Sequence, residues 1–293
     1  MGREQPIYKG LKHMADNRED TALRRMQLEE LAILREFVAI CKRHGLRYYI
    51  IGGTLLGAIR HGGFIPWDDD IDVAMPRPDY ERFIRIDEGE FAGPFALSTF
   101  EGDASNHYPW ARMTSNRMKL VNHMADIPRT ELAWIDLIPL DGMPDGGIAR
   151  AAHKARLSFW WNLNQIVQFD RLVDQKRKRG LLGRLSIKAA SCFKWLSRFI
   201  DYKTCLRKLN AILKSCPYDS CSKDIVNYLA AFGFDEIFPR AAFGQGSVYR
   251  FEDMELIGPD DADAICTKIY GSGYMTPPPI DERNKHHAEI VDG

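Results

Sequence analysis

The chain has 293 residues, 45% of them apolar, which is enough to bury a substantial core in one large domain or two smaller ones. Lysine plus arginine and aspartate plus glutamate number 40 each, so the overall charge points to no partner, nucleic acid included. The six cysteines lack CxxC or zinc-ligand spacing, and no signal peptide, membrane-spanning run or internal repeat is recognisable, so we expect a cytoplasmic protein with reduced thiols.

The first elements are a helix and a short strand. Residues 1–20 are polar and without a pattern, which predicts a flexible N-terminal segment. Apolar residues then recur at helical spacing from Thr21 to about Cys41, and His44-Gly45 ends the pattern, so we expect a helix that packs on the core. Residues 48–51 form an apolar run typical of a strand.

A glycine-rich turn follows this strand. Gly52, Gly53 and Thr54 separate the strand from a new helical pattern, which Gly62-Gly63 ends. Two glycines let a backbone approach a ligand closely, the free N–H groups of a helix start favour a phosphate, and Thr54 can cap the helix. We therefore predict a site for phosphate here.

An acidic cluster comes next, with Asp68, Asp70 and Asp72 at alternating positions. In an extended strand these three side chains would share one face, while Ile71 and Val73 would point into the core. Three carboxylates on one face repel one another unless a cation lies among them, and oxygen ligands favour Mg²⁺ or Mn²⁺. The alternative is a solvated acidic turn, but the upstream glycine turn and the interleaved apolar residues favour a metal site.

Residues 52–73 resemble the signature of a known family. They read Gly-Gly-Thr-Leu-Leu-Gly-Ala-Ile-Arg-His-Gly-Gly-Phe-Ile-Pro-Trp-Asp-Asp-Asp-Ile-Asp-Val and continue as Met-Pro-Arg-Pro-Asp-Tyr. The stretch is similar to the LicD family of phosphocholine transferases, which is related to the fukutin-type proteins and belongs to the nucleotidyltransferase superfamily. The resemblance implies metal-dependent transfer of a phospho-group from a cytidine diphosphate donor to a sugar hydroxyl.

The next elements are a helix at 79–86 and strands at 95–100 and 110–115. Arg112 lies in the last of these strands and is a candidate for neutralising donor phosphate, because guanidinium binds phosphate oxygens through two parallel hydrogen bonds. The alternative is an arginine on the surface.

The stretch 134–142 is an apolar strand that contains Asp136 and is similar to the family's second motif. Burying a carboxylate requires a cation or hydrogen bonds to compensate it. We therefore assign Asp136 as the third carboxylate, which either completes the metal site or deprotonates the acceptor hydroxyl. Asp141 is expected to cap an Asp-Gly turn.

Residues 150–215 are strongly basic, with 16 lysines and arginines against three aspartates. Within them, residues 181–200 read as an amphipathic helix with a basic face, which is a candidate for peripheral contact with an anionic membrane. The alternative is a core helix whose basic face is solvated. No zinc-finger or RNA-recognition motif accompanies the charge, so we expect no specific nucleic-acid partner.

The C-terminal part predicts a strand or hairpin within 248–259, a helix from about Asp260 to Tyr270, and a rigid loop. This loop, Tyr-Gly-Ser-Gly-Tyr-Met-Thr-Pro-Pro-Pro at 270–279, resembles the family's C-terminal motif and is followed by His286-His287. His286 is a candidate for contact with the acceptor or phosphate, as is Asp68, although a histidine in such a tail is usually only solvated.

Choline is a quaternary ammonium ion, which proteins commonly hold against aromatic rings. Trp67, Trp110, Trp134 and Tyr274 are candidate walls, although for each one alone core packing is the better explanation. With Arg60 and Arg112, we assign Trp67 and Tyr274 to donor binding.

The expected fold is α/β: a nucleotidyltransferase-like mixed sheet flanked by helices. We divide the chain into a flexible segment (1–20), a catalytic core (21–148), a basic helical segment (149–240) and a C-terminal part returning to the core (241–293).

The expected reaction is Mg²⁺-dependent or Mn²⁺-dependent transfer of phosphocholine from CDP-choline to a saccharide or its lipid-linked precursor, on the inner face of the membrane. Asp70 and Asp72 hold the metal, and cytidine monophosphate is released. The alternatives are transfer of ribitol or glycerol phosphate, nucleotidyl transfer to a small molecule, and a membrane-surface scaffold without activity.

Overall fold

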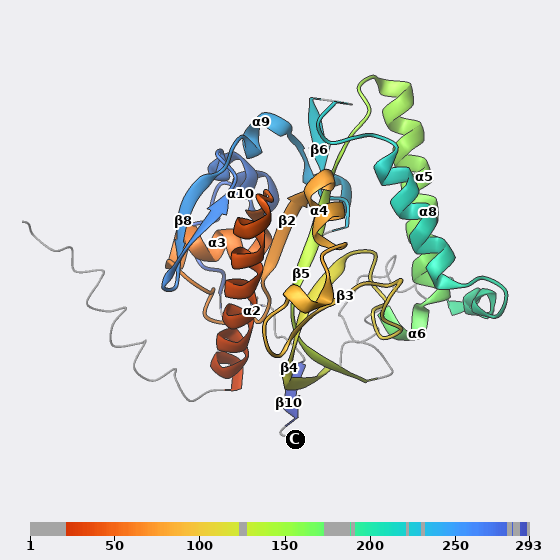
Figure 1. Cartoon of the computed structure of the whole chain (residues 1–293). Coiled ribbons are helices and arrows are strands. Elements are labelled where there is room, and N and C mark those ends of the chain that lie inside the picture. The colour runs from red at the N-terminus through yellow and green to blue at the C-terminus, as the bar shows by residue number, and fades with distance from the viewer. Residues whose placement is uncertain are drawn as a thin grey trace, which may run out of the picture.

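The computed structural model describes residues 22–122, 128–172, 188, 191–220, 223–229, 232–279, 283 and 288–291. Within this part of the chain the fold is α/β, with a curled mixed sheet flanked by helices, as the sequence predicts (Figure 1). His286 and residues 181–187, 189 and 190 lie outside the described residues, so the prediction for His286 has no structural counterpart here. In the described part of the stretch 181–200, residues Lys194–Arg198 form a short 3₁₀ turn rather than part of a long α-helix.

Eight described strands form the main sheet, in the order β1-β2-β5-β4-β10, with β3 beside β4 and with β6 and β7 continuing from β5. Among these described strands, only β2 and β5 pair in parallel. The strands are β1 (Tyr49–Ile50), β2 (Asp72–Pro76), β3 (Phe95–Ser98), β4 (Ala111–Asn122), β5 (Arg129–Gly142), β6 (Asp224–Val226), β7 (Ile237–Pro239) and β10 (Ala288–Val291).

Three helices of the first half pack on the sheet. The long α2 (Ala22–His44) lies across β4 and β5 and buries the predicted apolar stripe, including Leu34 and Phe37, against the sheet (Figure 1). Helix α3 (Gly52–His61) ends at Gly62, whose φ of 68° stops the helix as the sequence predicts. Helix α4 (Arg77–Phe83) follows β2, and the short 3₁₀ turn η1 (Glu88–Glu90) comes after it.

The middle of the chain forms a second helical layer. Helices α5 (Gly147–Val167) and α8 (Tyr202–Lys214) pack along each other at the right of Figure 1, with α6 (Phe169–Leu172) and the 3₁₀ turn η2 (Lys194–Arg198) at their lower end. The chain then returns to the sheet through β6 and β7, with the turn η3 (Gly233–Glu236) between them. The segment that we expected to be helical therefore also contributes two strands.

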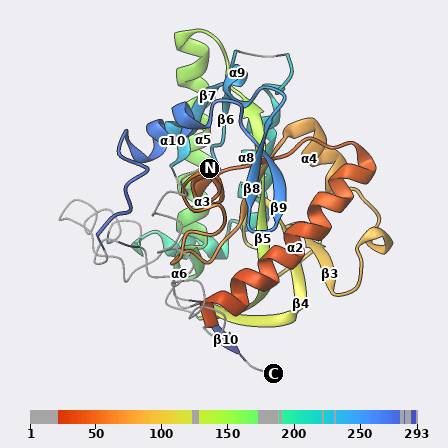
Figure 2. The same ribbon diagram turned by 90° about the vertical axis from the view of Figure 1, so that its left-hand side faces the viewer.

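The C-terminal part folds back onto the first half of the chain. After α9 (Arg240–Phe243), β8 (Ser247–Phe251) and β9 (Met254–Gly258) form the predicted hairpin, which lies beside α3 and β1 (Figure 2). Helix α10 (Ala262–Tyr270) also contacts α3. Strand β10 then adds to the edge of the sheet beside β4.

Asp141 does not cap a turn, as we expected from the Asp-Gly pair. It lies within β5 and is 1% exposed, and both of its oxygens accept hydrogen bonds from Arg77, with Nε 2.8 Å from Oδ1. Asn210 of α8 also accepts from the Arg77 guanidinium, at 3.3 Å. Because a buried carboxylate must be compensated, this ion pair ties β5, α4 and α8 together.

Two further features bear on the expectations from composition. Cys216 is disulfide-bonded, whereas Cys41, Cys192, Cys205 and Cys266 are free, so the expectation of reduced thiols throughout is wrong. That expectation used spacing along the chain, but a disulfide depends on closeness in space. No helix among the described residues is long and apolar enough to cross a membrane.

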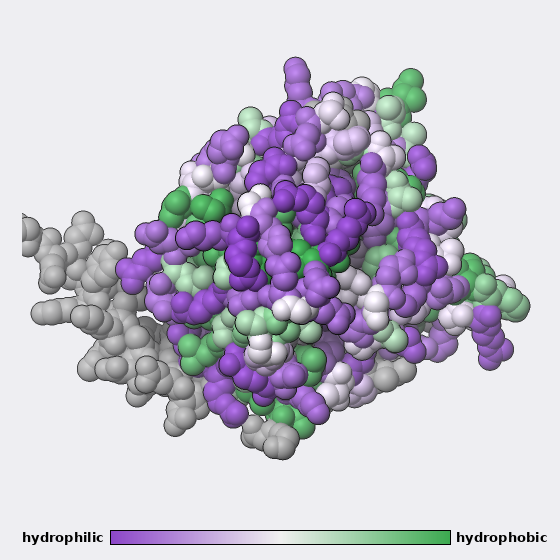
Figure 3. All heavy atoms as spheres, in the orientation of Figure 1, coloured by the Kyte–Doolittle hydropathy of each residue, from purple (hydrophilic) through white to green (hydrophobic). Residues whose placement is uncertain are grey.

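The face of the molecule seen in Figure 3 is mostly hydrophilic. One group of hydrophobic residues protrudes at its right-hand end, where the segment around η2 lies in Figure 1.

Candidate active site

The acidic cluster lies against the first residues of α3. A Cβ added to Gly53 would stand 2.4 Å from Oδ2 of Asp68 and 3.9 Å from Oδ1 of Asp70, and one added to Gly52 would stand 3.1 Å from Oδ2 of Asp72. Gly52 also has a φ of 56°, which residues with a side chain rarely adopt. The two glycines thus leave room for the three carboxylates, which gather at one end of this helix.

Thr54 has a different role from the helix cap that we expected. Helix α3 begins at Gly52, with Ile51 as its N-cap, so Thr54 is the third residue of the helix. Its Oγ1 accepts a hydrogen bond from the backbone N of Asp72 at 2.9 Å. Thr54 therefore fixes the start of β2 to the start of α3, which keeps Asp72 beside the glycine turn.

Asp72 and Asp136 are brought together by the pairing of β2 with β5. The two residues are direct partners in the parallel register, and the backbone N of Asp136 donates to the carbonyl of Ile71 at 2.9 Å. Residues opposite each other in paired strands point to the same face of the sheet. The two carboxylates predicted from separate motifs therefore lie on one face, next to Asp68 and Asp70.

The crowding of like charges affects protonation. Burial, followed by repulsion from Asp70, Asp136 and Asp68, raises the pKa of Asp72 well above its ordinary value. A cation or a bound proton would relieve this repulsion, so the end of β2 favours positive charge from outside the chain.

Asp136 is held by two donors from β4 and the loop before it. The indole Nε1 of Trp110 and Nε of Arg112 donate to its Oδ1 at 2.7 and 2.8 Å. The Arg112 guanidinium carbon lies 3.9 Å from the ring centroid of Tyr108 and 4.3 Å from that of Trp134. The carboxylate of Asp136 is thus fixed in direction by a guanidinium that is itself held between two rings.

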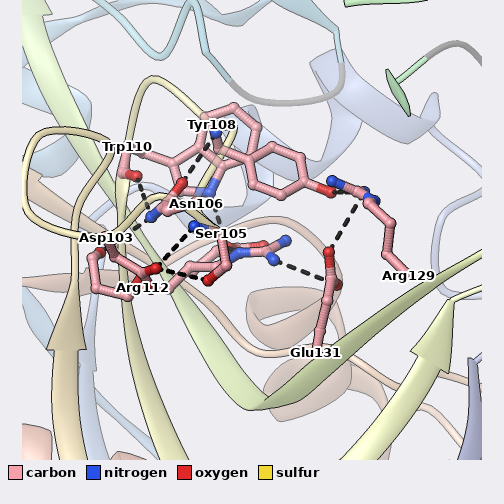
Figure 4. Close-up of polar contacts among 10 residues, drawn as sticks. Asp103, Ser105, Asn106, Tyr108, Trp110, Arg112, Arg129 and Glu131 are labelled. Atoms are coloured by element: carbon pink, nitrogen blue, oxygen red, sulfur yellow. Dashed lines mark hydrogen bonds and ion pairs between the residues drawn. The ribbon is translucent and has the colours of Figure 1, made fainter. Parts of the chain in front are cut away.

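A second layer of polar contacts surrounds Arg112 (Figure 4). Glu131 lies 3.5 Å from Arg112 Nη1 and 3.3 Å from Nη2 of Arg129, and Arg129 also donates to the hydroxyl of Tyr108 at 2.9 Å. Burial disfavours the charge on Arg112, but Asp136 and other nearby groups outweigh it and raise the pKa of Arg112. Arg112 is therefore a buried positioning group for Asp136, and the alternative of an arginine on the surface is wrong.

The donor atoms of the cluster suit a hard divalent cation, because they are carboxylate oxygens crowded by like charge. Among the described residues, however, no three acidic, histidine or cysteine side chains are already grouped as metal ligands. Asp68, Asp69 and Asp70 also take part in other interactions. The residues thus fit Mg²⁺ or Mn²⁺ by chemistry, and a full set of ligands would require side chains to move or substrate oxygens to join.

The other predicted donor residues gather around Trp67, beside the acidic cluster. The guanidinium carbons of Arg60 and Arg283 lie 5.9 and 4.0 Å from the Trp67 ring centroid, and His61 meets the ring edge-on at 6.2 Å. Arg60 Nη1 also donates to the carbonyl of Tyr274 at 2.8 Å. The C-terminal loop is thereby fastened to the residues that precede the aspartates.

Two functional candidates were missed by our reading of the sequence. Glu30 of α2 is 1% exposed, and among the described residues its Oε2 has no hydrogen-bond partner. Burial, followed by repulsion from Asp70, Asp69, Asp68 and Asp136, raises its pKa well above the ordinary value. The sequence did contain a signal for Glu30. This residue lies four positions before Leu34, so it falls on the apolar stripe of α2, where an acidic side chain is unexpected.

The second is Gln27, one turn earlier on the same helix. It is 5% exposed, and its Nε2 donates to the backbone carbonyl of Asp68 at 2.8 Å. A polar side chain on the buried side of α2 thus holds the backbone of the acidic segment in place. Helix α2 therefore contributes to the site, whereas we expected it to serve only the core.

Comparison with known proteins finds the same region. Residues 45–140 match the family model described as LicD/FKTN/FKRP, nucleotidyltransferase domain. This range contains the glycine turn, the acidic segment and Asp136.

Curated relatives agree with this match. The chain is 28% identical over 278 residues to the lipopolysaccharide cholinephosphotransferase LicD of Haemophilus influenzae, covering 91% of this chain and 96% of that protein. It is 49% identical over 41 residues to the human ribitol 5-phosphate transferase FKRP, covering 14% of this chain and 8% of that protein. At residues 45–140 the chain therefore carries a nucleotidyltransferase domain of the LicD/FKTN/FKRP family, as the resemblance in its sequence indicated.

Proposed function

We propose that this chain transfers a phospho-group from a cytidine diphosphate donor to a hydroxyl of a saccharide, with phosphocholine as the first candidate for the group. The observation that carries the proposal is the pairing of Asp72 with Asp136 on neighbouring strands, next to the glycine start of α3. Carboxylates beside a helix N-terminus provide both a place for a cation and a place for phosphate.

Each residue has a distinct role in this proposal. Asp70 and Asp72 would hold Mg²⁺ or Mn²⁺, which when bound offsets the charge of the donor diphosphate and of the departing nucleotide. The backbone N–H groups of Gly52 and Gly53 receive phosphate oxygens, because they open α3 and have no intrahelical acceptors.

Asp136 orients or deprotonates the acceptor hydroxyl, with its direction set by Trp110 and Arg112. The acceptor oxygen forms a new bond to phosphorus, the bond from that phosphorus to cytidine monophosphate breaks, and the proton leaves by way of the base. The product is a phosphodiester of the saccharide.

The recognition of choline is less well supported than phosphate transfer. Trp67 and Trp134, two of our candidate walls, already stack on Arg283 and Arg112 at 4.0 and 4.3 Å, and Trp110 donates to Asp136. A quaternary ammonium would have to use the opposite face of a ring or replace the guanidinium. Tyr274 donates its hydroxyl to Asp263, which leaves its ring as a remaining candidate.

Two observations bear on the choice of group. The relative named as a cholinephosphotransferase aligns with 91% of this chain, which favours phosphocholine and a saccharide acceptor of the lipopolysaccharide kind. The relative named as a ribitol 5-phosphate transferase aligns over only 41 residues, around the shared motif. Ribitol phosphate is therefore the second candidate.

Calorimetric titration tests the proposal directly. CDP-choline, CDP-ribitol and CDP-glycerol are titrated with Mg²⁺ into the native protein and into an Asp70→Asn/Asp72→Asn variant. We expect metal-dependent binding of one donor that the variant loses. Release of cytidine monophosphate supports phospho-group transfer, release of pyrophosphate indicates nucleotidyl transfer instead, and binding of no donor contradicts the proposal and favours a scaffold.

A further inference from the structure

The short segment around η2 exposes large aromatic side chains to solvent. Phe193 is 51% exposed, Trp195 is 52% exposed and Phe199 is 78% exposed. Trp195 and Phe199 meet edge to face with their ring centroids 5.9 Å apart, so they form one apolar surface. We call residues 193–199 the aromatic turn. Burying these rings against an apolar partner would be favourable, because the core of the protein does not cover them.

Basic residues surround the aromatic turn. Described residues 188 and 191–203 contain four basic groups, Lys188, Lys194, Arg198 and Lys203, against one acidic group, Asp201. Lys194 makes an ion pair with Asp170 at 3.3 Å. Arg198, which lies between Trp195 and Phe199 in the sequence, has an exposed side chain. Exposed aromatic rings among positive charges match the boundary of an anionic bilayer, where rings enter the headgroup layer and lysine and arginine meet phosphate.

The aromatic turn protrudes from the end of a helical layer, where a flat surface such as a bilayer could reach it (Figure 1 and Figure 3). It lies at the lower end of α5 and α8, and the hydrophobic group at the right-hand end of Figure 3 protrudes from the surface. A neighbouring pocket of about 400 Å³ contains Lys194 and Arg171 but also Asp170 and Asp201. Its charges balance, so the attraction to an anionic surface comes from the protruding turn.

We propose that the aromatic turn docks this protein on the surface of an anionic lipid bilayer, with Trp195 and Phe199 in the headgroup layer and Arg198 against lipid phosphates. In this docking the rings enter the headgroup layer and do not cross the bilayer. It is independent of the proposed transfer reaction. If both hold, an acceptor carried on a lipid is the substrate that this placement serves.

Vesicle co-sedimentation tests the docking without any substrate. The whole chain is mixed with vesicles of phosphatidylcholine and phosphatidylglycerol, and separately with vesicles of phosphatidylcholine alone. We expect binding to the mixed vesicles that weakens as salt is added, and much weaker binding to the neutral ones. Sedimentation with neither kind of vesicle, or equal binding to both, overturns the proposal.

Variants locate the binding surface. We expect Trp195→Ser/Phe199→Ser to lower the vesicle partition coefficient about tenfold or more, and Arg198→Gln to lower it about fivefold. Val248→Ser is the matched control, since Val248 is 61% exposed on β8, on the other side of the molecule in Figure 1, and should bind as the native protein does.

Two results with the double variant would overturn the proposal. One is native-like vesicle binding by a variant that keeps the native circular dichroism spectrum. The other is a loss of self-association in the absence of vesicles, because that result would assign the aromatic turn to a contact between copies of the chain.

Discussion

The strand pair β2–β5 has charged side chains at both ends. One end holds an ion pair, and the other holds neighbouring carboxylates. Where α4 begins, Arg77 and Asp141 are both buried and neutralise each other through two hydrogen bonds. At the other end, Asp72 and Asp136 lie side by side near Asp68 and Asp70. Arg112 pairs with Asp136, whereas burial and repulsion from the neighbouring carboxylates raise the pKa of Asp72.

The comparison shows how this fold treats charge. A buried charge that finds its partner within the chain supports the structure, because removing either partner leaves the other uncompensated. A buried carboxylate that is crowded by others, as Asp72 is, reduces stability, and a ligand that supplies positive charge would relieve the repulsion. The predictions below test this difference, beginning with the largest expected effect.

The first prediction concerns the acidic end. Asp72→Asn should lower the rate of phospho-group transfer at least about a thousandfold, because it removes a group that holds the cation. The same substitution should not lower the free energy of unfolding without metal, since it removes a repelled charge. Initial-rate kinetics and urea unfolding measure the two quantities. Near-native activity of this variant would show that Asp72 is not part of the active site.

The second prediction concerns the neutralised end. Arg77→Met should lower the free energy of unfolding by about 3–5 kcal/mol, because Asp141 is left buried without its partner. Urea unfolding measures this change. The double variant Arg77→Met/Asp141→Leu is the control and should recover much of the loss. An exposed ion pair contributes at most about 1 kcal/mol to stability. If the single variant loses less than about this amount, the pair does not support the fold.

The third prediction separates positioning from donor binding at Arg112. Arg112→Lys keeps the charge but loses the planar stacking between Tyr108 and Trp134, so kcat should fall about 10-fold to 100-fold while the KM for the donor changes little. Arg117→Lys, at an exposed arginine on the same strand, is the control. A raised donor KM with unchanged kcat would instead support our original assignment of Arg112 to donor phosphate.

The fourth prediction concerns pH and Glu30. Its pKa is raised in the folded state, so the folded protein keeps a proton that the unfolded chain releases. Without a divalent cation, the free energy of unfolding should therefore fall as pH rises above the ordinary glutamate value, by up to about 1.4 kcal/mol per pH unit for one such group.

Glu30→Gln should make this pH dependence shallower, and added Mg²⁺ should stabilise the native protein at high pH through binding. Urea unfolding from about pH 5 to about pH 8 checks both expectations, because this range lies above the ordinary pKa of glutamate. A slope that is the same in the native protein and in Glu30→Gln would show that Glu30 is not involved.

Much of the fold was readable from the sequence because it depends on local patterns. The helical stripe of α2, the glycine that ends α3, the hairpin β8–β9 and α10 all follow from periodicity and turn residues. The same local logic located the aspartates, since the glycine turn and the acidic segment are close in the chain. Comparison with known proteins confirmed the family at those residues.

The partners of these residues depended on tertiary structure. Arg112 and Asp136 are 24 positions apart, and Arg77 and Asp141 are 64 positions apart, so only the pairing of the strands shows which charges meet. A local reading made Asp141 a turn residue, did not show that Arg112 pairs with Asp136, and passed over Glu30 and Gln27.

Sequence by itself thus determined many of the elements, the family and the position of the aspartates, because propensity, turn chemistry and motif spacing act over a few residues. Only the tertiary structure decided which charges are neutralised and which are left crowded. The reason is that the electrostatic free energy of a side chain depends on burial and on neighbours that strand register and helix packing bring from distant parts of the chain.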